Sequence, residues 1–161
     1  MTLLRFAAIV GIGGSLLAVA VPAFLRNLSA AKTTEALDGL HTISRSAVSQ
    51  ADTHPQHESF PPSVELTPAE VPRGVRVKDP PGTWDHLTWR ALGFSIDHEH
   101  AYAFRFDSSF DRVSGVARFS ARAHGDLDGD GNLSTFEVRG ERQPNEPARV
   151  MAGLLISREI E

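Results

Sequence analysis

The residues best suited to chemistry are three aspartates and a glutamate in a short acidic segment. They follow the pattern D-x-[DN]-x-[DN]-G-x5-E, which is the pattern of a twelve-position calcium-binding loop. Calcium prefers oxygen ligands from carboxylates, carbonyls and water, and Gly131 permits the sharp turn at the sixth position. Asn132 would offer its carbonyl, Ser134 would act through a water and Glu137 would bind with both oxygens. The predicted Ca²⁺ ligands are therefore Asp126, Asp128, Asp130, Asn132, Ser134 and Glu137.

A solvated β-turn is the alternative interpretation of this segment, because Asp and Gly are favoured in turns for their own reasons. The residues before Asp126 have a strand pattern, so the flanks differ from the two helices of an EF-hand. Four carboxylates this close together repel one another without a cation, which favours the metal. No base or nucleophile accompanies them, so the predicted role of calcium is structural.

Other chemistry finds little support in the chain. Its seven histidines include no three with a recognisable metal-ligand spacing. There is no Ser-His-Asp ordering, nucleophile elbow or phosphate-binding loop, so an enzyme is not expected. The absence of cysteine excludes disulfides, thiolate metal sites and covalently attached c-type haem. A formal net charge of -4 is too small to imply a nucleic-acid partner.

The chain begins with an apolar element, an uncharged run from Phe6 to Leu25. A helix of about 20 residues spans about 30 Å, the hydrocarbon core of a bilayer. Three interpretations stay open: a signal peptide cleaved after Ala18-Val19-Ala20, a plain membrane anchor, or an anchor that becomes the core of a fibre.

After this run the pattern changes from an amphipathic helix to strands. Residues 26–52 carry an apolar stripe at helical spacing: Ala36, Leu40, Ile43 and Ala47. Residues 51–82 are rich in proline and predict a long extended connection. From residue 83 the pattern indicates strands, over 83–94, 102–106, 113–123 and 149–157, with another starting near Phe136. We therefore predict an α+β fold with two parts. The first is an N-terminal helix over 1–52, with 1–25 as transmembrane segment or filament core, and the second is an antiparallel β domain over 53–161.

The chain resembles the type IV pilins and the type II secretion pseudopilins. The resemblance is carried by Thr2-Leu3-Leu4, by the spacing of Gly14 and Pro22, and by Ala20-Val21-Pro22-Ala23-Phe24, which is similar to the Ala-Ile-Pro-Ala-Phe stretch of the family. Trp89, Leu92-Gly93-Phe94, Tyr102 and the aspartate-rich loop are similar to pilin-like proteins of deltaproteobacteria. The resemblance implies a long N-terminal helix, apolar in its first half, packed on a small antiparallel sheet.

The resemblance also implies assembly roles for Met1, Arg5, Gly14 and Pro22. Met1 would be the mature, methylated terminus, and Gly14 and Pro22 would bound a segment that melts in the filament. Arg5 stands where the family usually has a glutamate, and this charge reversal argues against an ordinary major subunit. No short basic leader ending in Gly precedes Met1, so the sequence is in its mature form, has a misassigned start codon, or is not processed.

These observations lead to an expectation about function. The expected protein is a structural subunit of a type IV pilus-like or pseudopilus filament, with copies of itself, other pilins and the assembly or secretion machinery as partners. It would wait in the bacterial inner membrane with its globular domain in the periplasm, and then enter an extracellular or periplasmic filament. Motility, adhesion, secretion and DNA uptake stay open as the purpose. The alternative is a secreted or membrane-anchored calcium-binding module.

Overall fold

The computed structural model describes residues 33–157 of the chain. The chain divides into two compact units, Met1–Thr33 and Thr34–Glu161, and the second contains the described elements. A helix over residues 33–51 comes first. The elements that follow are η1 (Gln56–Glu58), β1 (Val64–Thr67), α2 (Leu87–Leu92), β2 (Tyr102–Asp111), β3 (Val116–Gly125), β4 (Ser134–Arg142), β5 (Arg149–Val150) and β6 (Leu155–Ser157).

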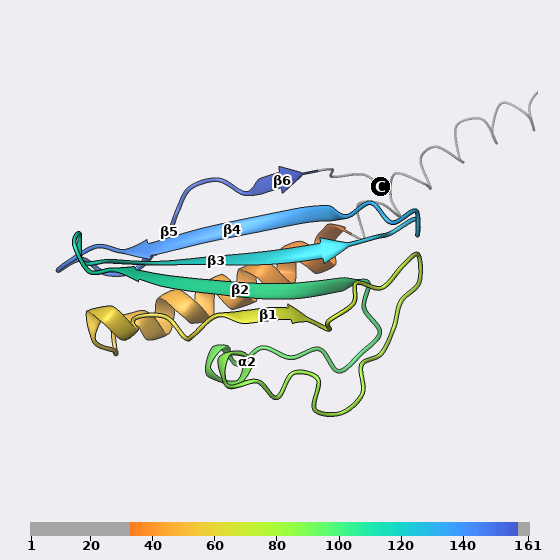
Figure 1. The fold of residues 1–161 in the computed structure, drawn as a ribbon, viewed down its shortest axis with the longest axis horizontal. Helices are drawn as coiled ribbons and strands as arrows, with labels where there is room; N and C mark the ends of the chain where they lie inside the picture. Colours follow the sequence, from red (N-terminus) through yellow and green to blue (C-terminus); the bar gives the residue numbers. More distant parts are fainter. Residues whose placement is uncertain (1–32, 158–161) are drawn as a thin grey trace, which may run out of the picture. The chain divides into compact units, whose positions relative to one another are not determined.

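The strands form one antiparallel sheet in the order β1-β2-β3-β4-β5, and β6 also pairs with β4. The centre is regular, since β2 and β3 pair without interruption from Tyr102↔Gly125 to Asp111↔Val116. Figure 1 shows the helix of residues 33–51, in orange, lying along one face of this sheet. The edge strands β1, β5 and β6 are all short.

The helix packs on the sheet through the predicted apolar stripe. Ala36, Leu40, Ile43 and Ala47 are all fully buried, as the helical spacing predicted. Small residues on the helix let it approach the sheet closely. A Cβ at position 39 would lie 2.5 Å from the ring of Phe104, so only a glycine fits there.

The alternating pattern of the central strands separates two faces, as predicted for β2 and β3. Phe104 and Phe106 of β2 and Phe119 of β3 are buried in the core with the helix. The opposite face carries charged side chains in a chain of ion pairs that crosses four strands, which we call the charge ladder. Its members, in order, are Glu65, Arg105, Asp107, Arg122, Glu137 and Arg139.

The segment over 83–94 is not a strand as predicted, but contains the short helix α2. His86 accepts a hydrogen bond from Thr88 N at the start of α2, and Gly93 ends it in the left-handed conformation, with φ 60°. The burial of Trp89 and Leu92, three residues apart, follows the helical period. Gly93 thus marks the end of a helix, and the aromatic residues around it are buried in the core instead of forming a strand.

The predicted fold class is wrong. The described chain is mostly a six-stranded antiparallel sheet, with a 19-residue helix over residues 33–51, the short helix α2 and no long apolar helix. The sheet is larger than predicted because the proline-rich connection contributes β1, and residues 149–157 contribute two short strands where one was expected. Short edge strands bury few side chains, so they leave little alternation in the sequence.

The features predicted nearest the N-terminus lie outside the described residues. These are the uncharged run of residues 6–25 and the assembly residues Met1, Arg5, Gly14 and Pro22. Within residues 33–157, no helix has the length and apolar character needed to cross a membrane.

Candidate functional site

The acidic loop joins β3 to β4 and brings three of the predicted ligands together. One carboxylate oxygen from each of Asp126, Asp128 and Asp130 lies within 4.8 Å of the other two. Asp126 is 1% exposed, whereas Asp128 and Asp130 are exposed. The cluster is therefore buried at Asp126 and open to solvent at Asp128 and Asp130, and its carboxylate oxygen atoms suit Ca²⁺.

The loop backbone folds around the carboxylate of Asp126. Its Oδ1 accepts a hydrogen bond from Gly129 N at 2.9 Å, and its Oδ2 accepts one from Gly131 N at 3.1 Å. Both glycines have positive φ, 81° and 92°. This conformation is strained for residues with a side chain, so the glycines let the loop wrap its aspartate. The loop is thus shaped by its own residues.

A distant segment also supports the loop. Gly74 N donates a hydrogen bond to Asp126 O at 2.7 Å, and Arg73 forms an isolated parallel bridge with Asp126. A Cβ on Gly74 would lie 3.4 Å from backbone atoms of Asp128 and Gly129. The sequence analysis missed this support, because no local pattern connects residues 73–74 to a loop some fifty positions later.

The side chains of the remaining predicted ligands make other contacts. Ser134 is fully buried and donates a hydrogen bond from Oγ to Gly125 O at 3.1 Å. The side-chain amide of Asn132 donates to Asp130 Oδ2 at 2.7 Å, beside the cluster. Glu137 is not among the clustered carboxylates. It lies in the charge ladder, 3.0 Å from Arg139 and 3.2 Å from Arg122.

The surroundings of Glu137 act on its ionisation in opposite directions. Burial raises the pKa of the Glu137 carboxyl, but its hydrogen bonds with Arg139 and the charge of Arg122 outweigh burial and lower the pKa. A carboxylate held by two guanidinium groups would have to leave both of them to bind a cation with two oxygens. In this geometry a cation would therefore be held by the three aspartates, with further oxygens from the loop.

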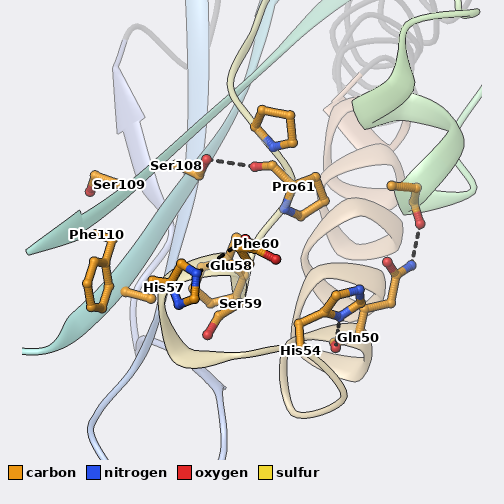
Figure 2. Close-up of a pocket in the computed structure, with 13 residues that line it drawn as sticks. Gln50, His54, His57, Glu58, Ser59, Phe60, Pro61, Ser108, Ser109 and Phe110 are labelled. Atoms are coloured by element: carbon orange, nitrogen blue, oxygen red, sulfur yellow. Dashed lines mark hydrogen bonds and ion pairs between the residues drawn. The ribbon is translucent and has the colours of Figure 1, made fainter.

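A second concave region is a groove of 530 Å³ beside the end of the first helix. Figure 2 shows its lining side chains, which come from the helix end, η1 and the segment after it, α2, β2 and β3. His54 Nδ1 lies 2.9 Å from Gln50 O, and His57 Nε2 lies 3.2 Å from the carboxylate of Glu58. Ser108 Oγ donates to Pro61 O at 2.6 Å. These polar groups form hydrogen bonds or an ion pair within the protein. They therefore hold neighbouring elements together, and the lining shows no converging set of reactive atoms.

Comparison of the chain with protein-family models, with curated proteins and with solved structures finds no match. The functional conclusion therefore depends on the residues and their geometry.

Proposed function

We propose that the protein is a structural subunit of a pilus-like or pseudopilus filament, and not an enzyme. The uncharged run of residues 6–25 would hold the subunit in the inner membrane before assembly and pack among neighbouring copies afterwards. The globular domain would then lie outside the cytoplasm. Other pilins and an assembly machinery would be its partners.

The observation that supports this proposal best is how firmly the helix of residues 33–51 is built into the sheet domain. Its buried stripe lies in the core, and its first turn is held by polar contacts. Glu35 accepts a hydrogen bond from Ala101 N at 2.8 Å and pairs with Arg76 at 2.6 Å. A force applied at the start of this helix would therefore act on the whole sheet domain. A subunit drawn out of a membrane and stacked needs such a connection.

Two measurements on the full chain test this proposal. Mass spectrometry should find a methylated residue 1, whereas cleavage near Ala20 or Ala23 would contradict it and support a secreted module. Negative-stain microscopy of material from the producing cells should show filaments that react with an antibody to the globular domain. Absence of the protein from every filament preparation would reject the proposal.

Calcium binding is a second candidate function, favoured by the convergence of the three aspartates. A cation there would relieve the repulsion among their carboxylates and fix the turn between β3 and β4. Isothermal titration of the full chain in detergent micelles should show heat on addition of millimolar CaCl₂ and a higher melting temperature. The variant Asp130→Asn should lose both effects, while Asp97→Asn, an exposed control 98% accessible, should keep them. No heat and no shift for the wild type would reject calcium.

A further inference from the structure

The face of the sheet that carries the charge ladder lies opposite the helix of residues 33–51 (Figure 1) and is open to solvent. Two of its arginines each hold an acid of their own strand with two nitrogens, and we call each such unit a fork pair. On β2, Nε and a terminal nitrogen of Arg105 both donate to the carboxylate of Asp107 at 3.0 Å. On β4, Arg139 holds Glu137 in the same way, with both distances 3.0 Å. Each fork pair thus places opposite charges two residues apart along one strand.

The strand register sets the two fork pairs side by side in opposite senses. Arg105 and Glu137 lie level with each other, because both pair with Arg122 of β3. Asp107 and Arg139 follow two residues later on their strands, so they are level as well. The four charges therefore form a square in which each positive corner has negative corners on both sides.

Two exposed apolar side chains stand beside this square, at the edge next to β4. Leu155 pairs with Glu137, and Met151 N donates a hydrogen bond to Arg139 O at 2.8 Å. Residues opposite each other in an antiparallel pair point to the same face, so both side chains lie on the charged face. Leu155 is 49% exposed and Met151 is 44% exposed. Large apolar side chains gathered on a surface are typical of an interaction site.

We propose that this face docks on the same face of a second copy of the chain. The two-fold axis lies in the plane of contact, across the strands, between the level of Arg105 and the level of Asp107. Each arginine of a fork pair then lies over the acid of the same fork pair in the second copy, and Leu155 lies over Met151. The contact goes beyond the filament proposed above, because none of its residues belongs to residues 1–32.

The remaining residues of the face select this axis over the other one that matches the fork pairs. An axis along β3 would also place opposite charges over each other, but it would bring the two copies of Arg122 together. It would also set Leu155 over Glu65, which pairs with Arg105 at the far side of the ladder. The axis across the strands places Arg122 over Ser120 instead. Like charges are thus kept apart and apolar groups meet each other, as an isologous contact requires.

The balance of forces favours a reversible dimer. Sheets that pack face to face lie about 10 Å apart, a distance that arginine side chains from both copies can fill. The acids and arginines are already paired within each copy, so no charge enters the contact without a partner. Leu155 and Met151 supply apolar surface whose removal from water drives the association.

Sedimentation equilibrium of the full chain in density-matched detergent micelles tests the contact by charge reversal. Asp107→Lys and Arg105→Glu each place like charges over each other, so each variant should self-associate at least about tenfold more weakly than wild type. An equimolar mixture of the two variants restores every opposite pair and should associate as wild type does. Asp97→Lys, an exposed control outside the sheet, should leave the association unchanged.

Two results of this experiment would overturn the proposal. One is a wild type that remains monomeric, and the other is equal association of wild type and both charge reversals. Association through residues 1–32 alone would give the second result, because it does not involve these charges. Loss of the face-to-face contact would therefore leave the filament proposal standing.

Should a charge reversal prevent folding, cross-linking tests the same contact without one. The chain has no cysteine, so Leu155→Cys and Met151→Cys each carry a single thiol. A short bismaleimide should join a mixture of these variants into dimers more than it joins either variant alone. Val113→Cys, at a position 99% exposed between β2 and β3, should stay monomeric. Absent cross-linking of the mixture, or equal cross-linking of all three variants, would overturn the proposal.

Discussion

Replacing Arg142 with alanine should destabilise the domain more than any other change to a charged side chain on the sheet. Arg142 lies at the end of β4, and its guanidinium reaches the C-terminal end of the first helix. One terminal nitrogen donates to Ala51 O at 2.8 Å, to His54 O at 2.9 Å and to Ser59 Oγ at 3.0 Å. The side chain is 16% exposed, and Nε lies 3.4 Å from Asp52. This cation thus adds a charged donor at a helix end where Ala51 O otherwise accepts only a hydrogen bond of 3.3 Å from His54 N.

The magnitude follows from what the variant Arg142→Ala leaves behind. A hydrogen bond from a charged group contributes about 1.5–3 kcal/mol, and a buried acceptor left without a donor costs about 1–3 kcal/mol. The three acceptors share one nitrogen, so their contributions do not add, and we expect a loss of about 3 kcal/mol. Arg142→Lys keeps the charge without the fork of donors and should lose about half as much.

The assay is thermal and urea unfolding of the full chain in detergent micelles, followed by circular dichroism. A loss of this size corresponds to a melting temperature lower by roughly 10 °C in a domain of this length. Arg149→Ala is the matched control, since Arg149 is 59% exposed in its pairs with Glu141 and Glu146, and its loss should cost less than 1 kcal/mol. Equal losses for Arg142→Ala and Arg149→Ala would refute the argument that the helix end depends on this cation.

Two further substitutions test the core and the charge ladder by the same unfolding assay. Gly140→Ala should cost about 2 kcal/mol or more, because its Cβ would lie 2.1 Å from the ring of Phe119; a stability equal to wild type would mean that the ring has room to move. Glu137→Gln should cost about 1 kcal/mol at pH 7. Because Arg139 and Arg122 lower the pKa of Glu137 below its ordinary 4.5, this cost should be full above pH 5 and vanish as the pH falls through the folded pKa; a cost independent of pH would refute the pairing.

The periodic elements of this chain could be predicted from its sequence. The stripe from Ala36 to Ala47 and the alternation in β2 and β3 produce repeats long enough to recognise, and the structure confirms them. Segments without a period were predicted poorly. Thr83–Phe94 contains aromatic residues that favour strands, but tertiary packing of Trp89 makes it part of a helix. β1 lies between prolines and owes its pairing to β2.

In the candidate site, too, the features set by local sequence could be predicted, and those set by long-range pairing could not. The spacing of Asp126, Asp128 and Asp130 is local, and the structure brings their oxygens together. The position of Glu137 depends instead on strand register, which sets it opposite Arg122, and no sequence motif contains that register. The contact between the imidazole of His100 and the carboxylate of Asp79 likewise joins residues that are far apart in the chain.

The charge ladder has a consequence for how this face meets other molecules. Its three acids alternate with three arginines across the sheet, so its members carry no net charge. The alternating charges cancel at a distance, so the electric field of this face falls off within a few ångströms of the side chains. Another molecule would be neither attracted nor repelled by this face across solvent, and changes in salt would alter its approach little. Any specificity on this face must then be decided at contact, by the matching of alternating signs.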